Sequence, residues 1–243
     1  MSEPDRQRPK AARDDAQRSE ESAEGRPSNS EPEETSDIDL LREAGGEVIG
    51  FIKQAPWPLL LPSVLLAGGA VMDAWVSPLA SVAPAIVGLL KGVGWGLYFR
   101  IAMRASGGVA HSSFVVPIVA MVLAFVGLER GEWGIVMPLI IWLLPVVDYA
   151  VMYGEGAIGA LGGVLDTLKT APLLWLGTMF AILTGLLMVG FVLALPMSIF
   201  STYAHREGAW LADLIGGALV GPLVHVAVVY RARLFLSIHG DPA

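Results

Sequence analysis

The stretch TAPLLWLGTMFAILTGLLMVGFVLALPMSIFSTYA, residues 170–204, contains no charged side chain. A helix that crosses the hydrocarbon core of a bilayer needs about 20 predominantly apolar residues. The stretch is too long for one untilted span and too short for two. It therefore predicts one membrane helix over Pro172–Met197, which tilts in the bilayer or is ended or bent by Pro196.

Five more apolar stretches of similar length predict further spans. They are Trp57–Val76, Leu79–Ile101, Val109–Leu128, Trp133–Tyr153 and Trp210–Tyr230. Residues 38–54 and 158–169 are different, because apolar and charged residues alternate there at helical spacing. These two segments predict amphipathic helices at the membrane interface. The expected fold is all-α, a polytopic bundle of six spans with two interfacial helices.

The composition supports this class. Of the 243 residues, 54% are hydrophobic and 16% are charged, and the mean hydropathy is +0.59. Soluble domains carry about 25% charged residues, so the chain is too apolar for a soluble globular enzyme. A net charge of −7 offers no basic face for phosphates, so we expect no nucleic-acid partner.

The charges are concentrated near the N-terminus. Residues 1–45 hold 13 of the 23 acidic and 7 of the 16 basic residues. Residues 1–37 have almost nothing apolar to bury and predict a disordered acidic cytoplasmic tail. A docking or phosphorylation segment around Ser19, Ser22 or Ser28 is the alternative.

Basic residues near the span ends predict the topology. With the N-terminus inside, the two external loops hold only Arg130 and Arg206. The cytoplasmic segments then hold seven basic residues, Arg42, Lys53, Arg100, Arg104, Lys169, Arg231 and Arg233. We therefore expect both termini in the cytoplasm and the protein in the plasma (inner) membrane. Most of the tryptophans, Trp95 and Trp175 among them, fall near predicted span ends.

Three ionisable residues lie inside predicted spans, namely Lys91, Asp148 and His225. Such residues are candidate functional sites because a charge is unfavourable in hydrocarbon. Asp148 and His225 each follow a proline by three residues, and those prolines, Pro145 and Pro222, free the carbonyls of Ile141 and Ala218. One hypothesis is that the three converge on a polar site in the inner half of the bundle. The alternative is that they join helices by hydrogen bonds, with Lys91 resting on Trp95 and Tyr98.

Two rows of glycines at four-residue spacing predict close helix packing. They are Gly88, Gly92 and Gly96 in the second span, and Gly217 and Gly221 in the sixth. Packing within the chain is the simpler explanation. A homo-oligomer, or another membrane protein docked on these faces, is the alternative.

No catalytic motif is recognisable. The chain lacks HExxH, GxSxG and Walker sequences, has no cysteine, and has no pair of histidines at helical metal-ligand spacing. We therefore expect a protein that is not an enzyme and has no cofactor and no metal.

A short pattern in the second span carries a family resemblance. The sequence Gly96-Leu-Tyr98-Phe99-Arg100-Ile-Ala-Met-Arg104, after an amphipathic entry helix and a first span, resembles the bacterial and archaeal membrane family known as domain of unknown function 4013. The helix Leu161–Lys169 leading into a long apolar span resembles inner-membrane proteins of the YciC type. The likeness covers residues 47–239. It implies a six-span bundle and no site residues.

The sequence leads to two functions. The first is a non-catalytic accessory, assembly or structural component of the membrane, which packs against lipid and partner helices. The second is a small transporter or channel subunit that uses Lys91, Asp148 and His225.

Overall fold

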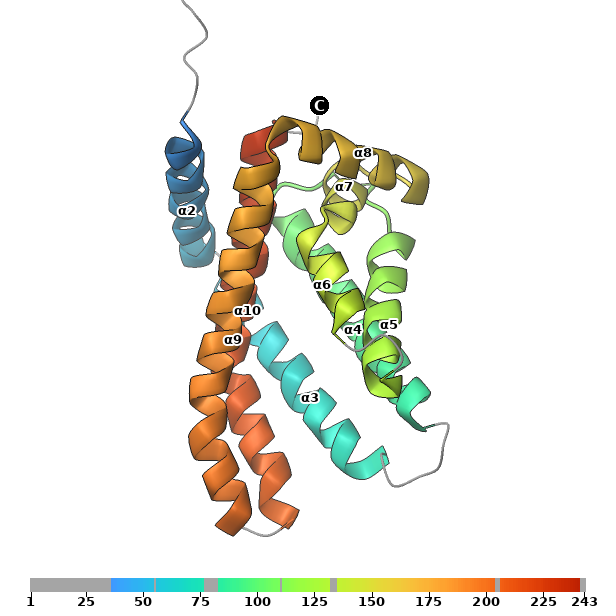
Figure 1. The fold of residues 1–243 in the computed structure, drawn as a ribbon, viewed down its shortest axis with the longest axis vertical. Helices are drawn as coiled ribbons and strands as arrows, with labels where there is room; N and C mark the ends of the chain where they lie inside the picture. Colours follow the sequence, from blue (N-terminus) through green and yellow to red (C-terminus); the bar gives the residue numbers. More distant parts are fainter. Residues whose placement is uncertain are drawn as a thin grey trace, which may run out of the picture. The chain divides into compact units, whose positions relative to one another are not determined.

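The computed structural model describes residues 36–54, 56–76, 83–109, 111–131, 135–203 and 206–240. These residues form nine α-helices and one short 3-10 helix, and no strand (Figure 1). The tail predicted over residues 1–37 lies, up to residue 35, outside the described residues. The elements in chain order are α2 (Asp37–Gln54), η1 (Trp57–Leu60), α3 (Leu61–Val76), α4 (Ala83–Ala105), α5 (Val115–Arg130), α6 (Val136–Leu143), α7 (Val146–Met152), α8 (Ala157–Thr170), α9 (Pro172–Tyr203) and α10 (Arg206–His239).

Within the described residues, three helices are long and apolar enough to cross a membrane. The qualifying segments are Pro84–Ala105 in α4, Pro172–Leu193 in α9 and Leu214–His239 in α10. A fourth span results if Asp37–Lys53 and Pro58–Asp73, which meet at 102°, form one broken span. The all-helical class is therefore confirmed, while six spans and their topology stay a prediction. α3 and α5 have only 16 residues each, which is about 24 Å of helix against a hydrocarbon core of about 30 Å.

The glycine row of α4 lies directly against α5. An ideal Cβ built on Gly88 would be 2.7 Å from the Cα of Val126, and one on Gly96 would be 2.5 Å from the Cα of Ile118. Gly92 faces the backbone of Val122 in the same way. Only glycine permits such an approach, because any side chain would displace the α5 backbone. The two helices therefore pack as one rigid pair.

α10 contacts α2, α3 and α9 along its length (Figure 1). Its own glycines face α3, since a Cβ on Gly217 would be 2.9 Å from the Cβ of Leu66, and Gly221 lies against Ser63. On the α2 side, the Tyr230 hydroxyl donates to the Leu41 carbonyl at 3.3 Å, and Arg233 pairs with Glu47 at 3.2 Å. Both glycine rows of the sequence are thus occupied by helices of the same chain.

Two predicted spans have different bounds in the structure. The fourth is broken at Leu144 and Pro145 into α6 and α7, because proline at residue 145 has no N–H for the Ile141 carbonyl. The sixth does not end at Tyr230, since α10 continues to His239 with Leu234, Phe235 and Leu236 buried. The helix can continue past Arg231 inside the core because Asp148 neutralises the charge of this arginine.

Two smaller expectations also differ from the structure. The helix of the third predicted span begins at Val115 rather than Val109, because Val109 and Ser113 instead bond to the end of α7. The N–H groups of Val109 and Ser113 donate to the carbonyls of Met152 and Ala150 at 3.2 and 2.9 Å. In the fifth, Pro196 does not end the helix, since α9 runs on to Tyr203.

α8 corresponds to the second predicted interfacial helix, and it lies across the end of the bundle beside α7 (Figure 1). Ala160, Val164 and Thr167 form its buried face. Ile158, Leu161 and Leu165 form a second, exposed apolar row. The helix therefore has an apolar side that the chain itself does not cover.

Candidate functional site: polar contacts between the helices

Lys91 on α4 is held by two carboxylates from neighbouring helices. Its Nζ lies 2.7 and 2.8 Å from the two carboxylate oxygens of Asp73 on α3, and 2.6 Å from Oε1 of Glu129 on α5. The side chain of Lys91 is only 12% exposed, whereas that of Asp73 is 50% exposed. The ammonium has three N–H donors, and all three have an acceptor here. The group of three carries a formal charge of −1.

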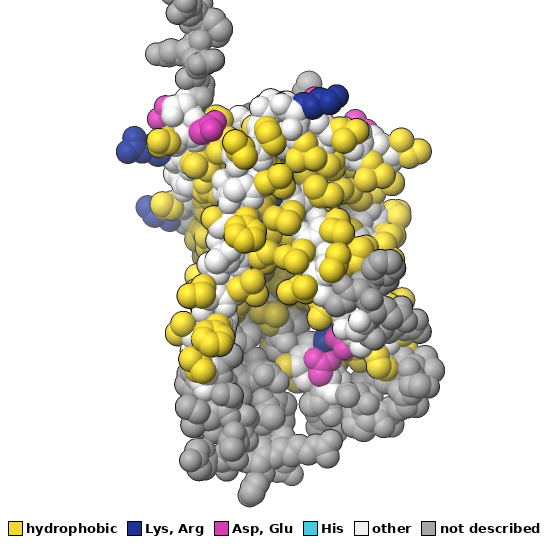
Figure 2. Space-filling view, in the orientation of Figure 1, with side chains coloured by type: hydrophobic (Ala, Val, Ile, Leu, Met, Phe, Trp, Pro, Cys, Tyr) yellow, Lys and Arg dark blue, Asp and Glu magenta, His cyan; other side chains and the backbone are white. Residues whose placement is uncertain are grey.

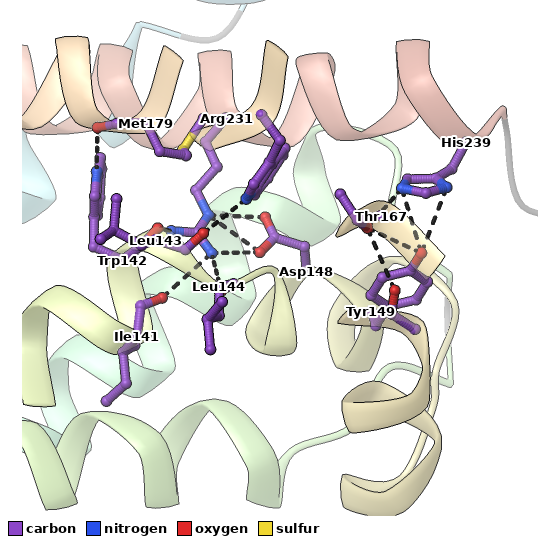
Figure 3. Close-up of polar contacts among 12 residues, drawn as sticks. Ile141, Trp142, Leu143, Leu144, Asp148, Tyr149, Thr167, Met179, Arg231 and His239 are labelled. Carbon is purple, nitrogen blue, oxygen red and sulfur yellow. Dashed lines mark hydrogen bonds and ion pairs between the residues drawn. The ribbon is translucent and has the colours of Figure 1, made fainter. Parts of the chain in front are cut away.

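Asp148 on α7 forms a buried ion pair with Arg231 on α10 (Figure 3). The guanidinium donates through Nε to Oδ1 at 2.9 Å and through Nη2 to Oδ2 at 2.5 Å. Both residues are almost fully buried, at 0% and 1% exposure. The two-pronged geometry is the one that matches guanidinium to carboxylate best.

The same arginine satisfies the backbone where the fourth span is broken. Arg231 also donates to the carbonyls of Leu144 at 3.0 Å and Ile141 at 3.4 Å, and to that of Trp142. The remaining carbonyl of the break, that of Leu143, accepts from the indole of Trp175 at 2.8 Å. An unsatisfied buried carbonyl is destabilising. One arginine and one tryptophan therefore permit a helix break inside an apolar core.

Two tryptophan rings enclose the guanidinium. The Cζ of Arg231 lies 5.3 Å from the ring centroid of Trp142 and 5.5 Å from that of Trp175. Trp142 is itself fixed by its indole N–H, which donates to the Met179 carbonyl at 3.1 Å (Figure 3). The rings exclude water from the pair and add cation–π attraction.

His225 on α10 has a different partner, the hydroxyl of Tyr98 on α4. The Tyr98 hydroxyl oxygen is 2.9 Å from Nδ1, and both side chains are buried. The Ala218 carbonyl freed by Pro222 on the same helix accepts from the hydroxyl of Ser63 at 3.2 Å. Each freed carbonyl that the sequence identified therefore has a donor from another helix.

The structure does not bring Lys91, Asp148 and His225 together. Among the described residues, no hydrogen bond or ion pair joins any two of the three. Lys91 is seven residues from Tyr98 on α4, and His225 is six residues from Arg231 on α10, which at 1.5 Å per residue is about 10 and 9 Å. The three residues have different partners and form separate inter-helix contacts, which argues against one convergent site.

A further polar cluster joins α7, α8 and the last turn of α10 (Figure 3). The Thr167 hydroxyl lies 2.8 Å from Nε2 of His239 and 3.2 Å from the Tyr149 hydroxyl. Asp166 lies 3.9 Å from Nδ1 of the same histidine. The order hydroxyl, imidazole, carboxylate is that of an activated nucleophile. Thr167 is fully buried, however, so its hydroxyl is not accessible to a substrate and acts as a link between helices.

The cation partners in these contacts were not identified from sequence. The sequence pattern placed Arg231 among the basic residues of the cytoplasmic segments instead. The available signal was the isolation of Asp148, because a lone carboxylate inside an apolar helix needs a cation from another element. In the ranges that the structure describes, no group of three His, Asp or Glu side chains is arranged to hold a metal ion.

Comparison with protein-family models, with curated proteins and with solved structures finds no match for this chain. The resemblance to the family of unknown function 4013 and to YciC-type proteins stays a prediction.

Proposed function

We propose that the protein is a non-catalytic integral membrane protein of the plasma (inner) membrane, an accessory or assembly component with both termini in the cytoplasm. The observation that carries this proposal is the complete use of Arg231, which neutralises Asp148 and satisfies the broken helix between α6 and α7. A residue so engaged inside the bundle has a structural role.

A charge inside an apolar core is unfavourable by several kcal/mol unless it is paired and hydrogen-bonded. A transport site keeps some of these partners free for its cargo. Here Asp148 contacts arginine and Lys91 contacts two carboxylates. His225 contacts Tyr98 through Nδ1, and its Nε2 has no hydrogen-bond partner among the described residues. Such pairing supports a fixed bundle over a moving one.

Of the three candidate spans, the one in α9 is the least covered by the rest of the described chain. The most apolar 18 residues of this span, which covers Pro172–Leu193, are only 6% buried. The span is nevertheless the most hydrophobic of the three. Hydrophobic side chains make up most of the described part of the face shown in Figure 2. The large exposed side chains of α9 are Leu173, Phe180, Leu187, Met188, Phe191, Val192 and Leu195. Because the glycine rows of α4 and α10 are already occupied, we assign α9 as the helix that contacts a partner protein.

Photocrosslinking in native membranes tests this assignment. A photoreactive phenylalanine analogue replaces Phe180 or Phe191 on α9, which are 64% and 63% exposed. Phe114, which is 52% exposed before α5, is the matched control. We expect one discrete protein adduct from both α9 positions and none from the control. Identical lipid-only products from all three positions contradict the accessory function.

The competing function, a small transporter or channel subunit, requires water to reach Asp148 and His225. It predicts that thiols placed beside these residues react with aqueous reagents. The accessory function predicts that they do not.

A further inference from the structure

A cavity lies between α3, α4, α5, α9 and α10. It has a volume of about 500 Å³, within the range of small-molecule sites. Its wall is mainly apolar and includes Leu65, Leu66, Trp95, Phe125, Leu193 and Val220. A ligand that fills it therefore needs a substantial apolar body.

One part of the wall is charged. Asp73 and Lys91 line the cavity, and Glu129 binds the same ammonium from behind. All three donors of Lys91 are directed at carboxylate oxygens, so the lysine has none left for an anion. The Asp73 carboxylate is half exposed, and the group carries a formal charge of −1. A positively charged ligand therefore complements this part of the wall.

Aromatic rings line the same space. Trp95 and Phe125 lie nearly parallel, with ring centroids 6.2 Å apart and an angle of 18° between their planes. Aromatic faces attract cations, and do so more strongly where water is excluded. A carboxylate beside aromatic and aliphatic walls is a combination that favours an organic cation over a hydrated inorganic one.

We propose that this cavity binds a lipophilic monocation, an ammonium or phosphonium group on an apolar body. The positive centre lies near the Asp73 carboxylate and the apolar body lies against Leu65, Trp95 and Phe125. This site is independent of the accessory function proposed above, since it uses none of α9's exposed side chains.

Two ions of almost identical size and opposite charge test the proposal. Tetraphenylphosphonium and tetraphenylborate are each equilibrated with the full chain in nanodiscs of zwitterionic lipid, and binding to empty nanodiscs is subtracted. We expect saturable binding of one tetraphenylphosphonium per chain and none for tetraphenylborate. Saturable binding of the borate, or no binding of the phosphonium above empty nanodiscs, overturns the proposal.

Charge variants locate the site. Asp73→Asn and Glu129→Gln each bring the group to a formal charge of zero, so both should weaken phosphonium binding at least tenfold. Lys91→Met leaves two adjacent carboxylates, and phosphonium binding should be kept. Unchanged affinity in Asp73→Asn, or loss of binding in Lys91→Met with the fold intact, contradicts the proposed charge complementarity.

A matched pair of glycine variants tests the cavity without touching any charge. Gly190 lines the cavity and Gly177 does not, and on both a new Cβ meets no atom within 4 Å. Gly190→Leu should abolish phosphonium binding while Gly177→Leu on the same helix leaves it unchanged. Equal binding in the two variants overturns the proposal. This pair decides the question even if a charge variant fails to fold.

Discussion

Arg231 on α10 extends to Asp148 on α7, with Nη2 2.5 Å from Oδ2 and neither side chain more than 1% exposed. The two residues are 83 positions apart in the chain. Their contact fixes the broken segment between α6 and α7 to the longest helix of the described bundle. The contact therefore joins the helices that correspond to the fourth and sixth predicted spans.

Removing one member of this pair should destabilise the protein strongly. Arg231→Met leaves a buried carboxylate and several carbonyls without a donor, and such a loss costs about 3–5 kcal/mol. Asp148→Asn combined with Arg231→Met should cost less than the sum of the single variants, because the two losses share one contact. Unfolding in detergent measures the loss of unfolding free energy in the single and double variants. Arg104→Met, which changes an exposed arginine of α4, is the control. Additive losses would argue against the coupling.

Arg231→Lys should be almost as unfavourable as Arg231→Met. A lysine ammonium has three donors and no planar fork, so it does not reach the carboxylate and the carbonyls of Leu144 and Ile141 together. The melting temperature of purified Arg231→Lys checks this expectation. A variant as stable as the original chain means that charge alone, rather than geometry, holds the break.

The α4–α5 contact should tolerate no added methyl group. Gly96→Ala places a Cβ 2.5 Å from the Ile118 Cα, and such overpacking costs about 1–3 kcal/mol. Gly177→Ala on α9 meets nothing within 4 Å and should stabilise its helix by about 0.5–1 kcal/mol. Melting temperatures of the two variants should therefore move in opposite directions. A shift of the same sign in both is incompatible with the close approach of α4 and α5.

The Ser63 hydroxyl should matter only because Pro222 is present. Ser63→Ala leaves the Ala218 carbonyl without a donor, and the loss should be about 1–2 kcal/mol. Pro222→Ala restores a backbone N–H for that carbonyl, so Ser63→Ala in the Pro222→Ala background should have almost no effect. A double-mutant cycle on unfolding free energies measures the coupling. Equal losses in the two backgrounds show that the hydroxyl acts elsewhere.

The cluster around Thr167 should fix α8 to the bundle. Thr167→Val keeps the shape and removes the hydroxyl that contacts Tyr149 and His239, so amide exchange over residues 157–170 should rise. Thr170→Val is the control, because the Thr170 hydroxyl donates only to the Asp166 carbonyl of its own helix. Mass spectrometry after exchange separates the two variants. Similar exchange in both shows that the cluster is not what holds α8.

The helices were largely predictable from the sequence because apolar length and periodicity are local signals. The break at Pro145 and the freed carbonyls of Ile141 and Ala218 also follow from local rules of proline chemistry. The partners of those carbonyls do not, since Arg231 and Ser63 come from elements far away in the chain. Trp175 shows the same limit, because a tryptophan near a predicted span end is fully buried in the structure rather than at an interface.

The most direct test of the structural role of the buried pair is thiol accessibility. The chain has no cysteine, so Val151→Cys beside Asp148 and Val228→Cys beside His225 and Arg231 give single thiols that leave every polar contact in place. Lys169→Cys, at an exposed charged position in the last turn of α8, is the reference. The folded variants are treated in vesicles of both orientations with a membrane-impermeant maleimide. We expect labelling of Lys169→Cys in one orientation and of Val151→Cys and Val228→Cys in neither. Labelling of Val151→Cys or Val228→Cys at a rate near that of Lys169→Cys shows a water path to the pair and contradicts the accessory function.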